Sequence, residues 1–452
     1  MKIGLGFVTG RNNFKSVLRT YISSFIENGL YGQGMSLDAF IAYDLGYMGT
    51  KLSDYRIIDQ GDIHRVNNVH YIGKETILND ISSLIKHGVL DFQESQLLFG
   101  EGYGKKRNII MYNAIINKID YLLFLDDDEY PLVPIKTGDN KLTWRGQDIA
   151  GCHLQSIGSA DVTNGYHSGY ISPIPYIEYN NVISEDDFRV FIEALSNDIL
   201  NWDSIKCKMA DDGVTYGDER LLESGEVAEV EEIHGTKFIS GSNLCINLRA
   251  NPESIPPFYN PPKARGEDTF FSTCLSELKV LRVPCYAFHD GFQNYNCLLN
   301  GVLPDRLIRQ QALSAPNIQR FLKASIGWAR YKPLLTYITH NNDYAYIIKN
   351  AKEKMQIEIP RFCEFFHTPE FEMIINEFQH YHDHVEEHFE SFERTKQAWK
   401  KVAAYARSID VPHHSIAPDV IPYYKELEKC YHILDRYPLT IEPVKMAKPV
   451  LV

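Results

Sequence analysis

Four acidic residues follow a short apolar run in the segment YLLFLDDDEY, residues 121–130. The apolar part is typical of a strand buried on both faces, and carboxylates cannot share such burial without compensation. Side chains alternate along a strand, so Asp126 and Asp128 would leave the sheet on one side, about 6 to 7 Å apart. At that spacing both can reach one hard divalent cation, whose remaining positions take phosphate oxygens. The alternative is a solvated acidic loop.

Three other segments carry residues suited to the same chemistry. They are TGRNN at 9–13, GEGYGKKRN at 100–108, and GED at 266–268 followed by a strand that ends at His289. Each also has a structural interpretation. Residues 105–107 would be a solvated basic patch, residues 267–268 a helix cap, and His289 a structural histidine.

The elements around these residues alternate between strand and helix over the first 130 residues. The strand candidates are 3–8, 40–44 and 121–125, and the helix candidates are 17–26, 74–86 and 109–118. This alternation predicts a doubly wound, mostly parallel sheet. Ligands of such sheets bind beyond the carboxyl ends of the strands, which is where Thr9, Asp44 and Asp126 would lie.

The remaining chain divides into a looser middle and a helical end. His167 and Tyr170 lie in a glycine-containing turn segment and are hypothesised to line an acceptor site, with a plain loop as the alternative. Regular structure is expected at 237–248, a strand at 280–288, and a helix from 267 to about 278. Apolar residues recur at helical spacing from 371 to 402. In this last stretch His380, His384 and His388 share one face, which is either a metal site or, as we favour, a solvated face.

Length and charge exclude several classes of protein. The 452 residues suffice for two or three domains, and 46 Lys and Arg against 59 Asp and Glu give a net charge of −13, so no nucleic-acid partner is expected. The eight cysteines form no Cys-x-x-Cys motif, which favours reduced thiols. Without a signal segment or a spanning apolar run, we expect a soluble, cytoplasmic protein. Peripheral membrane contact and homo-oligomerisation through the C-terminal helices stay open.

The ordered set of motifs resembles the GT-A glycosyltransferases, especially family two. In that family an Ala-Arg-Asn-like segment and an Asp-x-Asp motif hold the sugar nucleotide, and the Asp of a Glu-Asp pair is the base. The resemblance covers about residues 1–295. It implies an α/β fold of the GT-A type, a mixed, mostly parallel sheet flanked by helices with a helical C-terminal domain. The implied domains are a catalytic domain at 1–298, made of a nucleotide-binding half (1–130) and an acceptor half (131–298), and a helical region at 299–452.

The same resemblance implies roles for individual residues. The nucleotide sugar would be bound by Thr9, Arg11, Asp44, Arg107, Asn108, Asp126 and Asp127. The metal, Mn²⁺ or Mg²⁺, would be bound by Asp128, with His289 as a second metal or diphosphate ligand. Asp268 would be the general base, with Glu267 beside it. The implied reaction is transfer of a sugar from a UDP- or GDP-linked donor to a hydroxyl of a carbohydrate or other acceptor, with inversion.

Other readings of these motifs differ in how well they fit. A haloacid-dehalogenase-type phosphatase needs its Asp-x-Asp motif near the N-terminus, and a sugar-nucleotide pyrophosphorylase needs a glycine-rich first loop, so both fit poorly. A retaining GT-A transferase shares the sheet and the metal motif. A non-catalytic carbohydrate-binding or assembly protein on the same fold is the third alternative.

Overall fold

The computed structural model describes residues 1–30, 34–56, 65–137, 141–170, 173–195, 202–249 and 251–409. Residues Met1–Asp410 form one compact unit, and a second unit, Val411–Val452, lies outside the described residues. The end of the predicted helical region 299–452 is therefore not described. Among the described helices, none combines the length and apolar character needed to cross a membrane.

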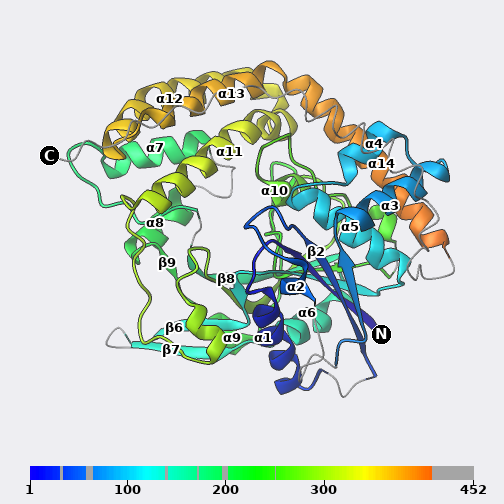
Figure 1. Cartoon of the computed structure of the whole chain (residues 1–452). Helices are drawn as coiled ribbons and strands as arrows, with labels where there is room; N and C mark the ends of the chain where they lie inside the picture. Colours follow the sequence, from blue (N-terminus) through cyan, green and yellow to red (C-terminus); the bar gives the residue numbers. More distant parts are fainter. Residues whose placement is uncertain are drawn as a thin grey trace. The chain divides into compact units, whose positions relative to one another are not determined.

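One mixed sheet lies at the centre of the compact unit (Figure 1). Its described strands are β1 (Lys2–Thr9), β2 (Ser36–Tyr43), β3 (Asn68–Ile72), β4 (Tyr121–Asp126), β5 (Glu129–Tyr130), β8 (Val162–Tyr170), β9 (Val214–Thr215), β10 (Ala228–Glu229), β13 (Leu244–Asn247) and β14 (Val280–His289). The strand order is β10-β14-β8-β13-β4-β1-β2-β3, with β5 paired to β14 and β9 to β8. Strands β1 to β4 are parallel, and so are β8 and β14, whereas β13 runs antiparallel between β4 and β8. The predicted α/β fold with a mixed, mostly parallel sheet is confirmed.

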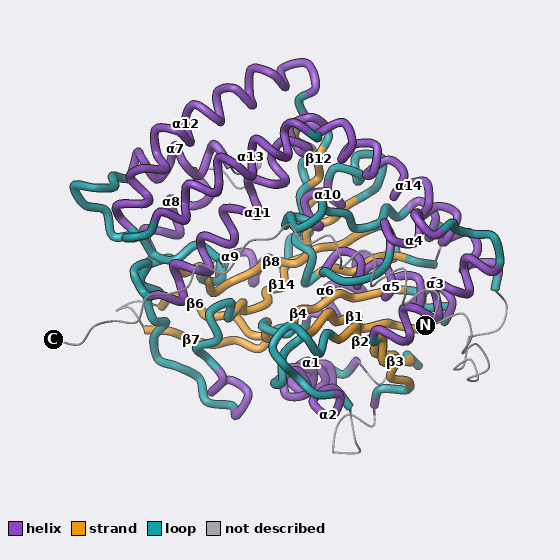
Figure 2. Tube along the Cα trace, turned by 45° about the horizontal axis from the view of Figure 1, so that its top comes forward, coloured by secondary structure: helices purple, strands orange, loops and turns teal. Residues whose placement is uncertain are grey.

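Helices cover both faces of the sheet, because alternate residues of its central strands point to opposite sides. Leu5 and Leu123 pack on the face covered by α1 (Phe14–Glu27) and α6 (Ile149–Ile157). Leu122 and Phe124 pack on the opposite face. That face is covered by α3 (Lys74–Lys86), α4 (Phe92–Leu98), α5 (Tyr103–Ile116) and α14 (Val385–Ser408). The tube in Figure 2 shows the two layers with the strands between them.

A second apolar core lies among helices beside the sheet. Its helices are α7 (Glu185–Leu195), α8 (Trp202–Ala210), α11 (Ala315–Thr339), α12 (Tyr344–Phe365) and α13 (Met373–Asp383). The predicted apolar stripe at 371–402 is helical, but it is divided between α13 and α14, and the break lies at His384. The helical C-terminal region is thus confirmed over the residues that the structure describes.

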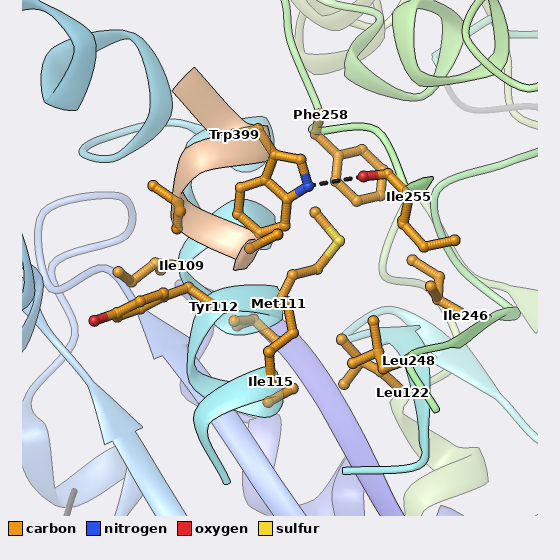
Figure 3. Close-up of a cluster of buried hydrophobic side chains, with 14 of the residues drawn as sticks. Ile109, Met111, Tyr112, Ile115, Leu122, Ile246, Leu248, Ile255, Phe258 and Trp399 are labelled. Carbon is orange, nitrogen blue, oxygen red and sulfur yellow. Dashed lines mark hydrogen bonds between the residues drawn. The ribbon is translucent and has the colours of Figure 1, made fainter. Parts of the chain in front are cut away.

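The last described helix, α14, returns to the sheet through Trp399. This side chain is 1% exposed and lies among apolar residues of α5 and of the segment before α10 (Figure 3). Its Nε1 donates a hydrogen bond of 2.7 Å to Ile255 O. The end of the described chain is therefore anchored both on α5 and on the segment before α10.

Short elements complete the described chain. They are α2 (Leu52–Tyr55), β6 (Leu132–Thr137), β7 (Lys141–Gly146), α9 (Glu219–Ser224), β11 (Glu232–Ile233), β12 (Thr236–Lys237), α10 (Glu267–Ser272) and the 3₁₀ turns η4 (Pro252–Ser254), η5 (Asn296–Asn300), η6 (Asn341–Asp343) and η7 (Pro369–Glu372). Several boundaries differ from expectation, and the segment of His167 and Tyr170, predicted as turns, belongs to strand β8. Helix α5 begins at Tyr103, after Gly102 with φ of 98°, whereas the helix was expected to begin at residue 109. Residues 105–108 are therefore part of this helix and not of the segment before it. Helix α10 ends at Ser272, earlier than residue 278.

Candidate active site

A cavity of about 870 Å³ lies at the carboxyl ends of β1, β4, β8 and β14, and residues of α5, α10, α11 and α14 also line it. This is the edge at which parallel α/β sheets bind ligands. Among the residues predicted from the sequence, the cavity is lined by Arg11, Arg107, Asp126, Asp128, His167, Tyr170, Glu267, Asp268 and His289. The other four predicted residues, Thr9, Asp44, Asn108 and Asp127, are not lining residues.

Asp127 joins the acidic turn to the loop after β1. Its Oδ2 accepts a hydrogen bond of 2.6 Å from Thr9 Oγ1, and its Oδ1 lies 3.0 Å from Arg11 Nε. Burial raises the pKa of Asp127 to about 6, although the charge of Arg11 opposes this shift. Thr9 and Asp127 therefore hold Arg11, which lines the cavity, in one position.

Arg107 lies between two carboxylates that come from different parts of the chain. Its Nη2 is 3.2 Å from Asp126 Oδ1, and its Nη1 is 3.8 Å from Glu267 Oε1. Burial raises the pKa of Asp126 to about 8, and Arg107 acts against that shift. The guanidinium occupies the space that a side chain at residue 241 would need, because a Cβ on Gly241 would lie 1.5 Å from Nη1. Helix α5 thus connects the end of β4 to the start of α10.

Asp128 and His289 meet at the end of β14. His289 Nδ1 donates a hydrogen bond of 2.9 Å to Tyr170 O, and His289 Nε2 lies 3.6 Å from Asp128 Oδ2. Burial disfavours the charged imidazole, but the attraction of Asp128 outweighs it and raises the pKa of His289 to about 9. Arg11 Nη2 lies 2.8 Å from the same oxygen of Asp128. Despite burial, these two cations hold the pKa of Asp128 well below its usual value.

Two side chains in this cavity, Asp128 and His289, are suited to bind a metal ion. Among the residues that the structure describes, no three or more His, Cys, Asp or Glu side chains form a cluster that could hold a metal ion. This applies equally to His380, His384 and His388. Mg²⁺ is often held by one or two protein carboxylates while substrate phosphates complete its coordination, and imidazole is an accepted ligand of Mn²⁺. Asp128 and His289 fit that incomplete donor set.

Asp268 lies in the first turn of α10, which begins directly after Gly266, whose φ is 88°. Its Oδ1 accepts a hydrogen bond of 2.9 Å from its neighbour's backbone, Thr269 N. Burial, and next the charge of Glu267, raise the pKa of Asp268 to about 6. A carboxylate with a pKa near neutrality in a cavity is suited to accept a proton.

Two predicted residues that do not line the cavity have their side chains engaged by other parts of the protein. Asp44 Oδ2 lies 2.7 Å from Lys106 Nζ, and this contact lowers the pKa of Asp44 although burial acts against it. Asn108 Nδ2 donates to Leu98 O and Phe258 O at 3.1 and 2.9 Å, and its Oδ1 accepts from Phe258 N at 2.8 Å. The amide of Asn108 therefore fastens α5 to the segment before α10.

The two residues predicted for the acceptor differ in what they offer. His167 lines the cavity with a quarter of its side chain exposed, at 26%. Tyr170 also lines the cavity, but its hydroxyl donates to Ile308 O at 2.7 Å and lies 2.7 Å from Tyr295 OH. The hydroxyl of Tyr170 is thus engaged within the protein.

Glu129 also lines the cavity, although it was not predicted as a site residue. It is 3% exposed, and its Oε1 lies 3.1 Å from His167 Nε2 and accepts a hydrogen bond of 2.7 Å from Ser242 Oγ. Although burial acts against ionisation, His167 holds the pKa of Glu129 below its usual value. Its position directly after the aspartate triplet was the available signal.

The helical region also supplies residues to the cavity. Arg320, Trp328 and Tyr331 come from α11, and His388 and Ser391 come from α14. No local motif marks the α11 residues, because their position depends on how the helices fold back over the sheet. His388 was assigned to a solvated face, and its place among the lining residues corrects that interpretation.

No protein-family model and no curated protein matches the chain. Among solved structures, the chain is similar to the crystal structure of S. aureus TarS 1-349, with 13% identity over 92% of this chain and 95% of that chain and a TM-score of 0.28. It is also similar to a crystal structure of S. aureus TarS, with 11% identity over 85% of this chain and 55% of that chain and a TM-score of 0.25. At such scores neither similarity bears on function.

Proposed function

We propose that the protein is a metal-dependent glycosyltransferase that moves a sugar from a UDP- or GDP-linked donor to an acceptor hydroxyl. The observation that carries this proposal is convergence. Asp126, Asp128, Asp268 and His289 come from three separate segments and line one cavity at the carboxyl edge of the sheet. A sugar transfer needs groups that compensate the negative charge of the leaving diphosphate and a group that accepts the proton of the acceptor hydroxyl. Asp128 and His289 suit the first task by holding a cation, and Asp268 suits the second.

The donor nucleotide is assigned to the part of the cavity nearest β1. Tyr47 and Tyr103 line the cavity and lie near Arg11, and Lys105 is another lining residue. Aromatic rings suit a base and cationic side chains suit phosphates, which supports a nucleotide there rather than an uncharged sugar. Asp44 and Asn108 would contribute indirectly, because Asp44 contacts Lys106 and Asn108 bonds Phe258, and both contacts position helix α5.

Asp128 and His289 are the residues that would hold Mn²⁺ or Mg²⁺. When bound, the cation would supply positive charge against the diphosphate leaving group. Arg11 and Asp127 fix the side chain of Asp128 from the other side. The protein thus contributes two ligands, and the donor's phosphate oxygens would supply further ones.

Asp268 is the proposed general base. Its carboxylate takes the proton of the acceptor hydroxyl while the hydroxyl oxygen bonds to the anomeric carbon of the donor. The bond from that carbon to the diphosphate breaks, and its electron pair leaves with the diphosphate. Attack from the side opposite the leaving group inverts the anomeric configuration. Arg107 contacts both Glu267 and Asp126 and would hold these two carboxylates in position.

Calorimetric titration tests the proposal directly. UDP-glucose, UDP-galactose, UDP-N-acetylglucosamine and GDP-mannose are titrated into the protein with and without Mn²⁺, and release of the nucleoside diphosphate is followed. Binding that requires Mn²⁺, together with diphosphate release, is expected. Binding without release or transfer would favour a carbohydrate-binding protein, and absence of binding by every donor would contradict the proposal. NMR of the product's anomeric proton separates inversion from retention.

A further inference from the structure

Glu129 lies between the two ends of the cavity that the proposed reaction uses. It follows Asp128 in the chain, and in the sheet it is the register partner of His289. On the other side it contacts His167, which belongs to the hypothesised acceptor end. Asp127 and Asp128 contact Arg11 in the loop after β1, whereas Glu129 contacts His167 on β8.

The two oxygens of this carboxylate are used differently. Oε1 accepts a hydrogen bond from Ser242 Oγ at 2.7 Å and lies 3.1 Å from His167 Nε2. Oε2 is buried and has no hydrogen-bond partner among the residues that the structure describes. A buried carboxylate oxygen without a donor is costly, so a position that retains one calls for a ligand that donates. An ionised carboxylate only accepts hydrogen bonds, and a sugar hydroxyl is a suitable donor.

We propose that Glu129 Oε2 accepts a hydrogen bond from a hydroxyl of the transferred sugar and so contributes to the choice of donor sugar. This inference rests on the glycosyl transfer proposed above. With the diphosphate at Asp128 and His289 and the acceptor near His167, the group between them is the sugar that moves from one to the other. Ser242 and His167 are then positioning residues, because they fix Oε1 and leave Oε2 for the substrate.

Glu129→Gln is the decisive substitution because it is isosteric. Ser242 Oγ donates to the Oε1 position, so we expect the new amide oxygen to stay there and the amide nitrogen to take the place of Oε2. A donor then stands where the sugar hydroxyl finds an acceptor in the wild type. Glu358→Gln is the matched control, since Glu358 is likewise buried, at 4% exposure, but contacts Arg361 on α12 and is not a lining residue.

The measurement compares sugar nucleotides with their bare diphosphates in the presence of Mn²⁺. The four sugar nucleotides named above, UDP and GDP are titrated into both variants and the wild type, and thermal unfolding confirms that each variant is folded. For the donor that binds, Glu129→Gln should lower the affinity for the sugar nucleotide about tenfold or more relative to the affinity for its bare diphosphate. The affinity for the diphosphate itself should stay within about twofold of the wild-type value. Glu358→Gln should leave this ratio unchanged.

The opposing results are distinct. If the wild type binds no nucleotide, the proposed transfer fails and this inference with it. If nucleotides bind but Glu129→Gln leaves the ratio within about twofold, or weakens both ligands equally, only the role of Glu129 is overturned. Should Glu129→Gln fail to fold, Ser242→Ala removes one of the donors that fix Oε1. It should lower the same ratio by a smaller factor, and an unchanged ratio there would also overturn the inference.

Discussion

His289 Nε2 lies 3.6 Å from Asp128 Oδ2, so the last residue of β14 and the acidic turn after β4 meet at one point of the cavity. The contact depends on the sheet, because β5, which begins directly after Asp128, pairs with the end of β14. A carboxylate and an imidazole brought together in this way can serve as an ion pair or as two ligands of one cation. The two cases differ in what removal of either side chain does to ligand binding.

Removal of either Asp128 or His289 should abolish the metal-dependent part of nucleotide binding. We expect Asp128→Asn and His289→Ala to reduce the affinity for UDP or GDP in Mn²⁺ to the value measured without metal, since each variant loses one of two protein ligands. Calorimetry with and without Mn²⁺ checks this. His380→Ala, on an exposed residue of α13, is the control and should bind as the wild type does. A full Mn²⁺ response in both site variants would refute the assignment.

Asp268→Asn should separate binding from turnover. The amide cannot take a proton, so kcat should fall by roughly 10² to 10⁴, while the donor's Kd should stay within about twofold because the residue acts on the acceptor. Steady-state kinetics and donor titration together test this. Wild-type turnover in the variant would show that another group is the base.

The dependence of kcat/KM on pH in the wild type should show the titration of the Asp268 carboxylate. Because burial raises the pKa of Asp268 to about 6, the carboxylate holds its proton below that pH and cannot act as a base. We expect kcat/KM to rise as the pH increases through about 6 and Asp268 loses its proton. The residual activity of Asp268→Asn should lack this limb, and a limb that persists in the variant would assign it to a different group.

Sequence patterns were sufficient for the parallel core and for most of the acidic edge. The continuous apolar run before Asp126 predicts a doubly buried strand, and β4 is one. The same pattern could not give strand direction, since β13 is mostly apolar like β4 and yet runs antiparallel to it. Nor could it find Arg320 or Trp328, because their approach to the cavity depends on tertiary packing of α11.

Burial also decided which polar residues reach the cavity. Asp127 and Asp128 are adjacent and chemically identical, yet Asp127 is used internally by Thr9 whereas Asp128 lines the cavity. Both residues lie in the turn between β4 and β5, where no regular alternation of side chains indicates which of the two faces the cavity. Asn108 is comparable: a polar residue in a motif, but one whose amide is engaged by backbone groups of other segments.

A methyl group at residue 241 should displace Arg107. In Gly241→Ala the added Cβ would lie 1.5 Å from Arg107 Nη1, so the guanidinium must leave Asp126 and Glu267. Buried carboxylates that lose their partner cost about 3 to 5 kcal/mol of folding free energy. Urea unfolding should detect that loss. Gly146→Ala, where an added Cβ has no neighbour within 4 Å among the described residues, should change stability by less than about 0.5 kcal/mol.

Two substitutions of Trp399 should separate the hydrogen bond from the packing that anchors α14. Trp399→Phe keeps an aromatic ring but leaves Ile255 O without its 2.7 Å donor, at a cost of about 1 to 3 kcal/mol. Trp399→Ala also opens a cavity against α5 and should cost about 3 to 5 kcal/mol. Denaturant unfolding measures both.

The control for these two variants is Tyr346→Ala, since Tyr346 on α12 is 73% exposed and its loss should change stability by less than about 0.5 kcal/mol. Helix α14 also carries His388 and Ser391 into the cavity. Loosening of this helix should therefore weaken ligand binding in Trp399→Ala more than in Trp399→Phe. Equal stability of the two variants would mean that packing around Trp399 contributes little and that α14 is held elsewhere.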